Sequence, residues 1–196
     1  MSAPRSLLFA PGAGASSASP WMQAWRQRLG ALGDVVTFDY PYMKAGRRAP
    51  DRPPALIAAH EAALAAARTG AHGPVFLIGK SMGSRIGCHV SLQNPVAGLI
   101  CLGYPLVSGA TGSMRDEVLV ALRTPILFVQ GTGDPLCPLG KLEAVRARLS
   151  ARNELHAVTG GNHSLELSHA KSKREAQEAS DQAVLEAIRS FVESVT

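Results

Sequence analysis

The sequence contains few cysteines, and their spacing excludes two common kinds of site. Cys88, Cys101 and Cys137 are the three cysteines of the 196 residues, and none lies in a C-x-x-C pair or at zinc-ligand spacing from a histidine. An odd number without such spacing argues against a disulfide framework and against a zinc site. We therefore expect reduced thiols, no bound metal and no cofactor.

Long hydrophobic runs are also missing. No apolar stretch approaches the roughly 20 residues that cross a bilayer, and residues 1–10 carry neither the apolar core nor the cleavage site of a signal peptide. A soluble, cytoplasmic protein with no membrane partner is expected.

Charge is sparse, at 18% of residues, and only one short segment concentrates it. Residues 44–52 contain Lys44, Arg47, Arg48 and Arg52, with a single acidic residue and no interleaved aromatic residue. With a net charge of only +5 and no nucleic-acid-binding motif, this pattern predicts no nucleic-acid partner. The segment is interpreted as a solvated loop, in preference to an anchor for acidic substrates. Composition leaves the oligomeric state open.

The hydrophobic residues, 46% of the chain, gather in short runs of a parallel-sheet type. These runs cover residues 6–10, 34–39, 74–79, 96–103, 125–130 and 154–159. Continuous rather than alternating hydrophobicity is typical of strands that are buried on both faces. The length and the absence of repeats predict a single domain over residues 1–196.

Helical patterns separate the apolar runs. Prolines open two of them, at Ser19-Pro20 and at Pro53-Pro54, and a capping box, Ser172-x-x-Glu175, precedes the last. Two more follow residues 79–83 and begin near Leu139. This alternation predicts an α/β fold: a three-layer α/β/α sandwich with a mostly parallel sheet of about six strands.

Three chemically active side chains follow predicted strands. Ser81 lies in G-K-S-M-G, Asp134 in G-T-G-D-P and His163 in G-G-N-H-S. A random order of this composition gives G-x-S-x-G about 0.16 times, so the pentapeptide alone proves little. Because the carboxyl ends of parallel strands meet at one edge of the sheet, the three are expected to converge there in the order Ser, Asp, His.

These residue types suit acyl transfer. A serine hydroxyl needs a neighbouring base, so we assign Ser81 as nucleophile, His163 as general base and then acid, and Asp134 as the group that orients the imidazole. The backbone N–H groups of Met82 and Ala13 are the predicted oxyanion donors. The alternative interpretations are a helix N-cap for Ser81, an Asx-turn for Asp134 and a surface-loop histidine for His163.

The motifs G-K-S-M-G-S-R, G-T-G-D-P-L-C-P and G-G-N-H-S resemble those of α/β-hydrolases. The likeness is to the small, lidless dienelactone-hydrolase-like group that includes the testis-expressed-protein type, and it extends from Leu7 to the last helix. It implies a sheet without the first two strands of the full fold and an esterase-like or thioesterase-like activity. Two positions depart from the group: Pro11 stands where many relatives have histidine, and Ser81 where true dienelactone hydrolases have cysteine.

A small-molecule acyl ester or thioester is thus the predicted substrate. A non-catalytic interaction module with the same fold, an acyltransferase and a peptidase remain as alternatives. Tyr40 and Tyr104 follow strand ends, and Trp21 starts a helix beside the oxyanion loop. All three are candidate substrate contacts, although they could also pack in the core. Lys80 is interpreted as a packed neighbour of Ser81, and Cys137 as structural.

Overall fold

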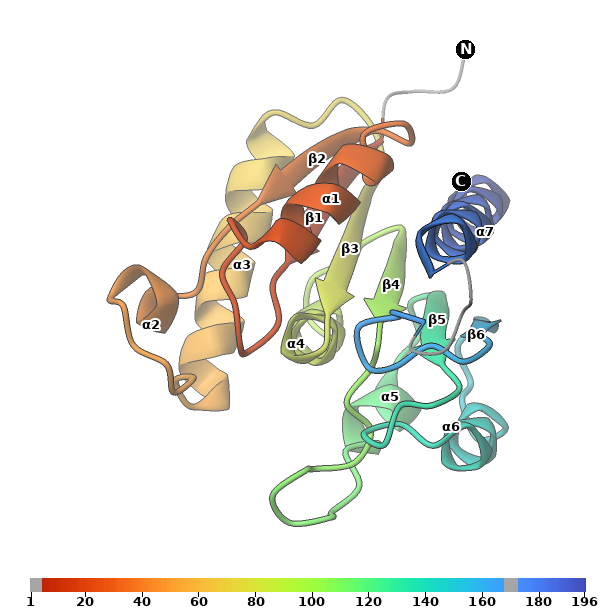
Figure 1. Ribbon diagram of the computed structural model, residues 1–196. Helices are drawn as coiled ribbons and strands as arrows, with labels where there is room; N and C mark the ends of the chain where they lie inside the picture. The colour runs from red at the N-terminus through yellow and green to blue at the C-terminus, as the bar shows by residue number, and fades with distance from the viewer. Residues whose placement is uncertain (1–4, 168–172) are drawn as a thin grey trace.

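The computed structural model of the protein describes residues 5–167 and 173–196, and it contains one parallel sheet (Figure 1). The strand order is β2-β1-β3-β4-β5-β6. The strands are β1 (Ser6–Ala10), β2 (Asp34–Thr37), β3 (Val75–Lys80), β4 (Gly98–Leu102), β5 (Ile126–Gly131) and β6 (Asn153–Val158). The predicted class, a mostly parallel α/β sandwich of about six strands, is confirmed.

Burial explains why these segments form strands. Every residue of β1, β3, β4 and β5 is buried, as continuous apolar runs require. The two edge strands, β2 and β6, are only partly buried. The inner strands contain three buried polar residues, Ser6, Lys80 and Gln130. β2 ends at Thr37, two residues before the end of the predicted run, because the chain turns into Tyr40 and Pro41.

Seven helices connect the strands in the described parts of the chain. They are α1 (Pro20–Leu29), α2 (Pro41–Lys44), α3 (Pro53–Thr69), α4 (Met82–Ser91), α5 (Glu117–Ala121), α6 (Leu139–Arg146) and α7 (Lys173–Ser194). The short α2 and α5 were not predicted, because four or five residues give no periodic stripe. Ser172, the predicted cap of the last helix, lies outside the described residues.

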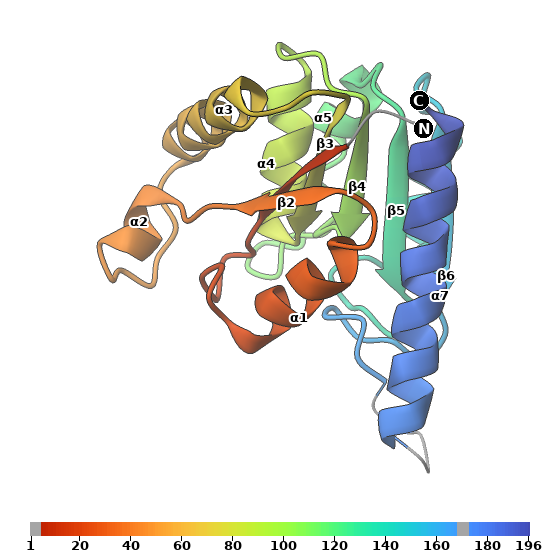
Figure 2. The same cartoon turned by 90° about the horizontal axis from the view of Figure 1, so that it is seen from above.

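The helices form one layer on each face of the sheet (Figure 2). α1 and α7 cover one face, where Trp25 and Phe191 pack against Phe9 and Ile78 of the sheet. α3, α4, α5 and α6 cover the other face, over the alternate set of strand residues such as Leu8 and Leu77. Each layer removes one face of the sheet from water, which is the main stabilising contribution of the fold.

The strand order determines where a site can form. From β1 the chain runs outward to β2 and then returns to β3 on the other side of β1. The loops that follow β1 and β3 therefore diverge, and they leave a crevice at the carboxyl ends of the strands. No helix among residues 5–167 and 173–196 combines the length and apolarity that crossing a bilayer requires.

Candidate active site

Ser81 occupies a sharp turn between β3 and α4. Its backbone has φ 50° and ψ −114°, a positive φ that L-residues rarely adopt. The turn is possible because its neighbours are glycines. A Cβ on Gly83 would lie 2.6 Å from the carbonyl oxygens of Ala10 and Pro11, and one on Gly79 would collide with the backbone of Ser84. The pentapeptide thus holds the Ser81 hydroxyl at the start of α4.

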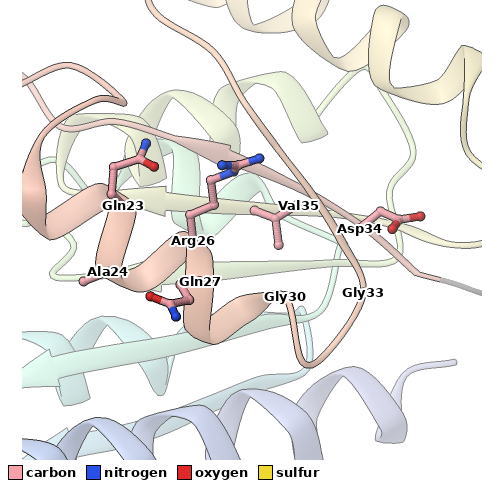
Figure 3. Close-up of a pocket in the computed structure, with 8 residues that line it drawn as sticks. All are labelled: Gln23, Ala24, Arg26, Gln27, Gly30, Gly33, Asp34 and Val35. Atoms are coloured by element: carbon pink, nitrogen blue, oxygen red, sulfur yellow. The ribbon is translucent and has the colours of Figure 1, made fainter.

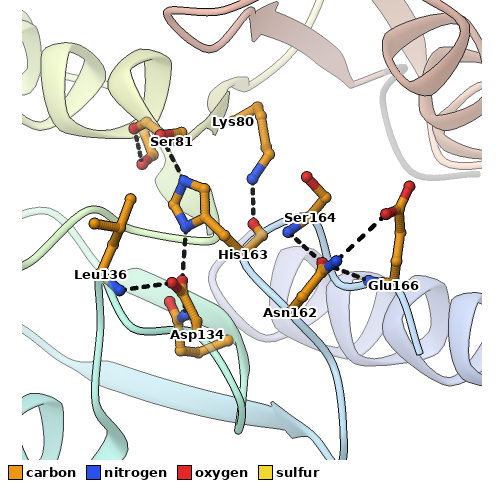
Figure 4. A network of polar contacts seen from close by, with 10 residues as sticks. Lys80, Ser81, Asp134, Leu136, Asn162, His163, Ser164 and Glu166 are labelled. Carbon is orange, nitrogen blue, oxygen red and sulfur yellow. Dashed lines mark hydrogen bonds and ion pairs between the residues drawn. The ribbon is translucent and has the colours of Figure 1, made fainter. Parts of the chain in front are cut away.

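Ser81, His163 and Asp134 form one hydrogen-bonded chain (Figure 4). His163 Nε2 lies 2.8 Å from Ser81 Oγ, and His163 Nδ1 lies 2.7 Å from Asp134 Oδ2. An ionised carboxylate can only accept, so Nδ1–H donates to Asp134 and Nε2 is left to accept from the Ser81 hydroxyl. A hydroxyl held this way can lose its proton to the imidazole as it attacks.

Asp134 is held as a carboxylate by several donors. Its side chain is fully buried, and besides His163 it accepts from the Leu136 N–H at 2.8 Å and from Gln130 Nε2 at 2.5 Å. Burial raises the pKa of Asp134, but the hydrogen bonds and the charge of His163 outweigh burial and hold the pKa below its ordinary value. The arrangement favours the ionised form that orients an imidazole.

Gln130 is a site residue that the sequence analysis missed. It is the last residue but one of β5, which is otherwise apolar, and its side chain is fully buried beside Asp134. The signal was present as a lone polar residue inside a buried run, four positions before the candidate carboxylate. Its role as a hydrogen-bond donor to Asp134 depends on the turn after β5, which brings the two side chains together.

Four hydrogen bonds hold the loop that carries His163, two of them within the loop and two from outside it. The Asn162 side chain accepts from the Ser164 N–H at 2.7 Å and from the Glu166 N–H at 3.1 Å. The Trp21 indole donates to the Ser164 carbonyl at 2.9 Å, and Lys80 Nζ donates to the His163 carbonyl (Figure 4). These contacts tie the loop to β3 and to α1, so the imidazole has a fixed place.

Lys80 is a buried cation beside the nucleophile. Only 9% of the residue is exposed, and Nζ lies 5.5 Å from the centre of the Trp21 ring. Burial lowers the pKa of Lys80 to about 8, although the carboxylates of Asp134 and Glu166 act in the opposite direction. The ammonium thus connects the strand end, the indole and the His163 loop.

A cavity of about 380 Å³ opens beside the three side chains, and Ser81 and His163 line it. Most of the remaining wall is apolar, from Ala13, Ala15, Trp21, Met22 and Leu136. Trp21 and Ala13 thus both line the cavity, and their roles toward a substrate stay predictions. Ala13 lines the cavity, and its N–H donates to no other protein group among residues 5–167 and 173–196. Met82 directly follows Ser81 as the first residue of α4 but is not one of the residues that line the cavity.

Tyr40 and Tyr104 do not contact this cavity, and the prediction that they bind substrate is wrong. Both are 0% exposed, within the core between the sheet and α3 to α6. The Tyr40 hydroxyl lies 3.2 Å from Nδ1 of His60, and the Tyr104 hydroxyl donates to the Arg115 carbonyl at 2.9 Å. Each ring turns away from the strand end because a buried partner satisfies its hydroxyl.

Other parts of the described chain offer less chemistry. A larger cleft of about 830 Å³ lies between α1 and β2 (Figure 3), where Gln23, Arg26 and Asp34 line it without a serine, cysteine or histidine. Residues 5–167 and 173–196 contain no group of three or more His, Cys, Asp or Glu side chains that could hold a metal ion.

Comparison with known proteins identifies the family of this fold. The sequence model of the alpha/beta hydrolase domain matches residues 3–193. An alpha-beta serine hydrolase homologue from Coxiella burnetii shares 19% identity over 92% of this chain and 84% of its own, with a TM-score of 0.71.

Two further solved structures have the same fold. The dienelactone hydrolase of Anabaena variabilis shares 20% identity, over 91% of this chain and 85% of its own, with a TM-score of 0.66. The RedJ thioesterase of the prodiginine biosynthetic pathway in Streptomyces coelicolor shares 20% identity, over 92% and 86%, with a TM-score of 0.64. Because the domain match spans nearly every residue, the chain belongs to the α/β-hydrolase family of enzymes.

Proposed function

We propose that the protein is a serine hydrolase that cleaves a carboxylic ester or thioester through an acyl-enzyme. The observation that carries this proposal is the continuous chain from Ser81 Oγ through the His163 ring to the buried Asp134 carboxylate, with separations of 2.8 and 2.7 Å. Nucleophile, base and orienting group are each within hydrogen-bond reach of the next.

The first half-reaction forms the acyl-enzyme. Ser81 Oγ attacks the carbonyl carbon while its proton passes to His163 Nε2, and Asp134 stabilises the imidazolium that results. The N–H groups of Ala13 and Met82 donate to the oxyanion. When the tetrahedral intermediate collapses, the bond to the leaving oxygen or sulfur breaks and His163 returns the proton to it.

The second half-reaction releases the acid. A water molecule gives a proton to His163 Nε2 and attacks the acyl carbon, and the proton then returns to Ser81 Oγ as the acyl bond breaks. The enzyme is restored, and the products are a carboxylic acid and an alcohol or thiol.

The size and lining of the cavity suit a small, apolar acyl group. Its walls are mainly apolar, and 380 Å³ is at the small end of the range of ligand pockets. Residues 103–125, between β4 and β5, contain one short helix, α5, and form no large cap over the site. The similarity to a dienelactone hydrolase and to a thioesterase suits ester or thioester cleavage.

A fluorophosphonate probe tests the nucleophile directly. The parent enzyme should be labelled at Ser81, and Ser81→Ala should lose both the label and hydrolysis of an activated ester, by on the order of 10³-fold or more. Ser164→Ala is the matched control, because Ser164 lines the same cavity. Retention of label and turnover by Ser81→Ala would refute the proposal.

A further inference from the structure

A second cleft adjoins the cavity beside Ser81. It has a volume of about 580 Å³ and shares Ala13, Gly14 and Ala15 with that cavity, so the loop between β1 and α1 forms a wall of both. Its opposite wall is α2 and the residues that follow it, and the Tyr42 hydroxyl joins the two walls by donating to the Ala13 carbonyl at 3.0 Å. In Figure 2, α2 projects beyond β2 on the side of this loop.

The wall formed by α2 and its following loop is basic. Arg47 and Arg48 line the cleft, and Lys44 and Arg52 lie on the same exposed segment. The nearby carboxylates are engaged: Asp51 pairs with Arg47 at 2.7 Å, and Asp39 accepts from the Ser17 N–H at 2.7 Å. Arg48 forms no ion pair with any residue of 5–167 or 173–196. Arg47 is thus charge-paired, and Arg48 is the guanidinium that lines the cleft without a carboxylate partner in the described structure.

The two spaces differ in the chemistry they suit. The cavity beside Ser81 is mainly apolar and suits the acyl group, whereas the basic cleft suits an oxyanion. A substrate that fills both would carry its negative charge on the leaving-group side of the scissile bond. Guanidinium groups bind phosphate through paired hydrogen bonds, and their charge also attracts an anionic substrate from solution.

We infer that the cleft between residues 13–16 and 42–48 binds a phosphate on the alcohol or thiol leaving group. This inference rests on the proposed function, since it names the substrate class of the same site. It assigns Arg48, with Arg47, as a specificity-determining residue. The basic segment is then the anchor for an acidic substrate that the sequence analysis weighed and disfavoured.

Two thioesters that differ only by one phosphate test the inference. S-butyryl pantetheine and S-butyryl 4′-phosphopantetheine have the same acyl group and the same scissile bond. The parent should prefer the phosphorylated thioester by about fivefold or more in kcat/KM, mainly through KM. Added salt should reduce this preference, because the cleft is exposed to solvent.

Three variants and a third thioester locate the charge. Arg48→Gln should lower the preference, and the double variant Arg47→Gln/Arg48→Gln should abolish it. Lys141→Gln removes the same charge on α6, remote from α2 in Figure 1, and should keep the preference of the parent. S-succinyl pantetheine, whose charge lies on the acyl side, should gain no advantage over the butyryl compound.

Several results would overturn the inference: equal use of both butyryl thioesters by the parent, a preference that survives the double variant, or an equal loss in Lys141→Gln. Calorimetric binding of 4′-phosphopantetheine and of pantetheine to the parent and to Arg48→Gln gives an answer that does not depend on turnover. If Ser81 cleaves neither an ester nor a thioester, the proposed function fails, whereas tighter binding of the phosphorylated compound that needs Arg48 still supports the cleft. Equal binding of the two compounds would contradict it.

Discussion

Two histidines each contact a polar side chain at hydrogen-bond distance, in two regions that differ in access and charge. His60, on α3, is fully buried, with Nδ1 at 3.2 Å from the Tyr40 hydroxyl and with no partner for Nε2 in the described structure. His163, after β6, is a quarter exposed along its side chain and lies between a carboxylate and a serine hydroxyl. Both rings are held in place, but only His163 has a charged partner.

The difference shows what makes an imidazole a usable base. Burial lowers the pKa of His60 to about 3, so this ring stays neutral at any ordinary pH and has no ionised neighbour to stabilise its cation. His163 faces Asp134, whose carboxylate can stabilise an imidazolium, and it also lines a cavity that a substrate can enter. Fixed geometry alone does not make a base.

Removing the His163 ring should have the largest effect. His163→Ala deletes the imidazole that accepts the proton of the Ser81 hydroxyl, and ester hydrolysis should fall on the order of 10⁵-fold. His60→Phe is the matched control and should keep kcat within about threefold of the parent. Comparable losses in both variants would end the distinction between the two regions.

Asp134→Asn tests the charged partner of His163. An amide favours the wrong imidazole tautomer, so kcat should fall by roughly 10⁴-fold while the fold is retained. A residue that only forms an Asx-turn would tolerate asparagine. Hydrolysis within about threefold of the parent would therefore mean that Asp134 is a turn residue and that His163 works without it.

Gln130→Met tests how far the carboxylate depends on its other donors. Loss of the amide donor should raise the pKa of Asp134 toward its ordinary value, since one of the bonds that lower it is removed. We expect about a tenfold loss of kcat/KM, and the acid limb of the pH profile should move to higher pH. A profile that superimposes on that of the parent would limit Gln130 to packing.

Lys80→Met should have a smaller effect on rate and an opposite effect on stability. We expect about a fivefold loss of kcat, because the His163 carbonyl loses its bond to Nζ. At pH 7 Lys80 is charged in both the folded and the unfolded chain, and its burial disfavours the folded one. The variant should therefore have a higher Tm.

The pKa of about 8 sets the pH window of this stability gain. From pH 8 to about 10.5, folded Lys80 is neutral while unfolded Lys80 is still charged, so the cost of burying the cation is relieved as the pH rises. Thermal unfolding at pH 7 and at pH 9.5 checks this, and Lys80→Met should gain more at pH 7. An equal gain at both values would contradict a buried charge.

The smallest effect is expected from His60→Phe under acid conditions. In the unfolded chain His60 becomes protonated below its ordinary pKa of about 6.5, whereas in the folded chain it stays neutral down to about pH 3. The folded state therefore loses stability as the pH falls from about 6.5 to about 3. Between pH 7 and pH 4.5 the Tm of His60→Phe should fall by less than the Tm of the parent. Parallel losses would show that His60 is protonated within the fold.

The strands and the convergence of the three site residues could be predicted because they depend on local patterns and on one topological rule. Buried runs predict parallel strands, and their carboxyl ends share an edge, which brings Ser81 and His163 to one place. The direction in which a side chain turns after a strand has no such signal. Tyr40 and Trp21 were both candidate substrate contacts in the sequence, yet Tyr40 faces the core and Trp21 lines the cavity.

Contacts that depend on tertiary distance were equally out of reach. The support of Asp134 by Gln130 follows from a turn, and the bond from Lys80 to the His163 carbonyl spans 83 residues. Whether residues 44–52 face solvent or a substrate cleft also depends on where the β1–α1 loop lies, and no local pattern records that.

The braces of the His163 loop also bear on how activity emerges as the chain folds. Trp21 reaches the Ser164 carbonyl across 143 positions, and Ser81 reaches the imidazole across 82. Contacts between residues so far apart in the sequence form late in folding, because closing a long loop costs conformational entropy before the contact contributes any stability. A nascent or partly folded chain that already has β1, β3 and the turn at Ser81 would hold a serine with no base. Recovery of hydrolysis during refolding should therefore follow the docking of the last strand and report the completed sheet.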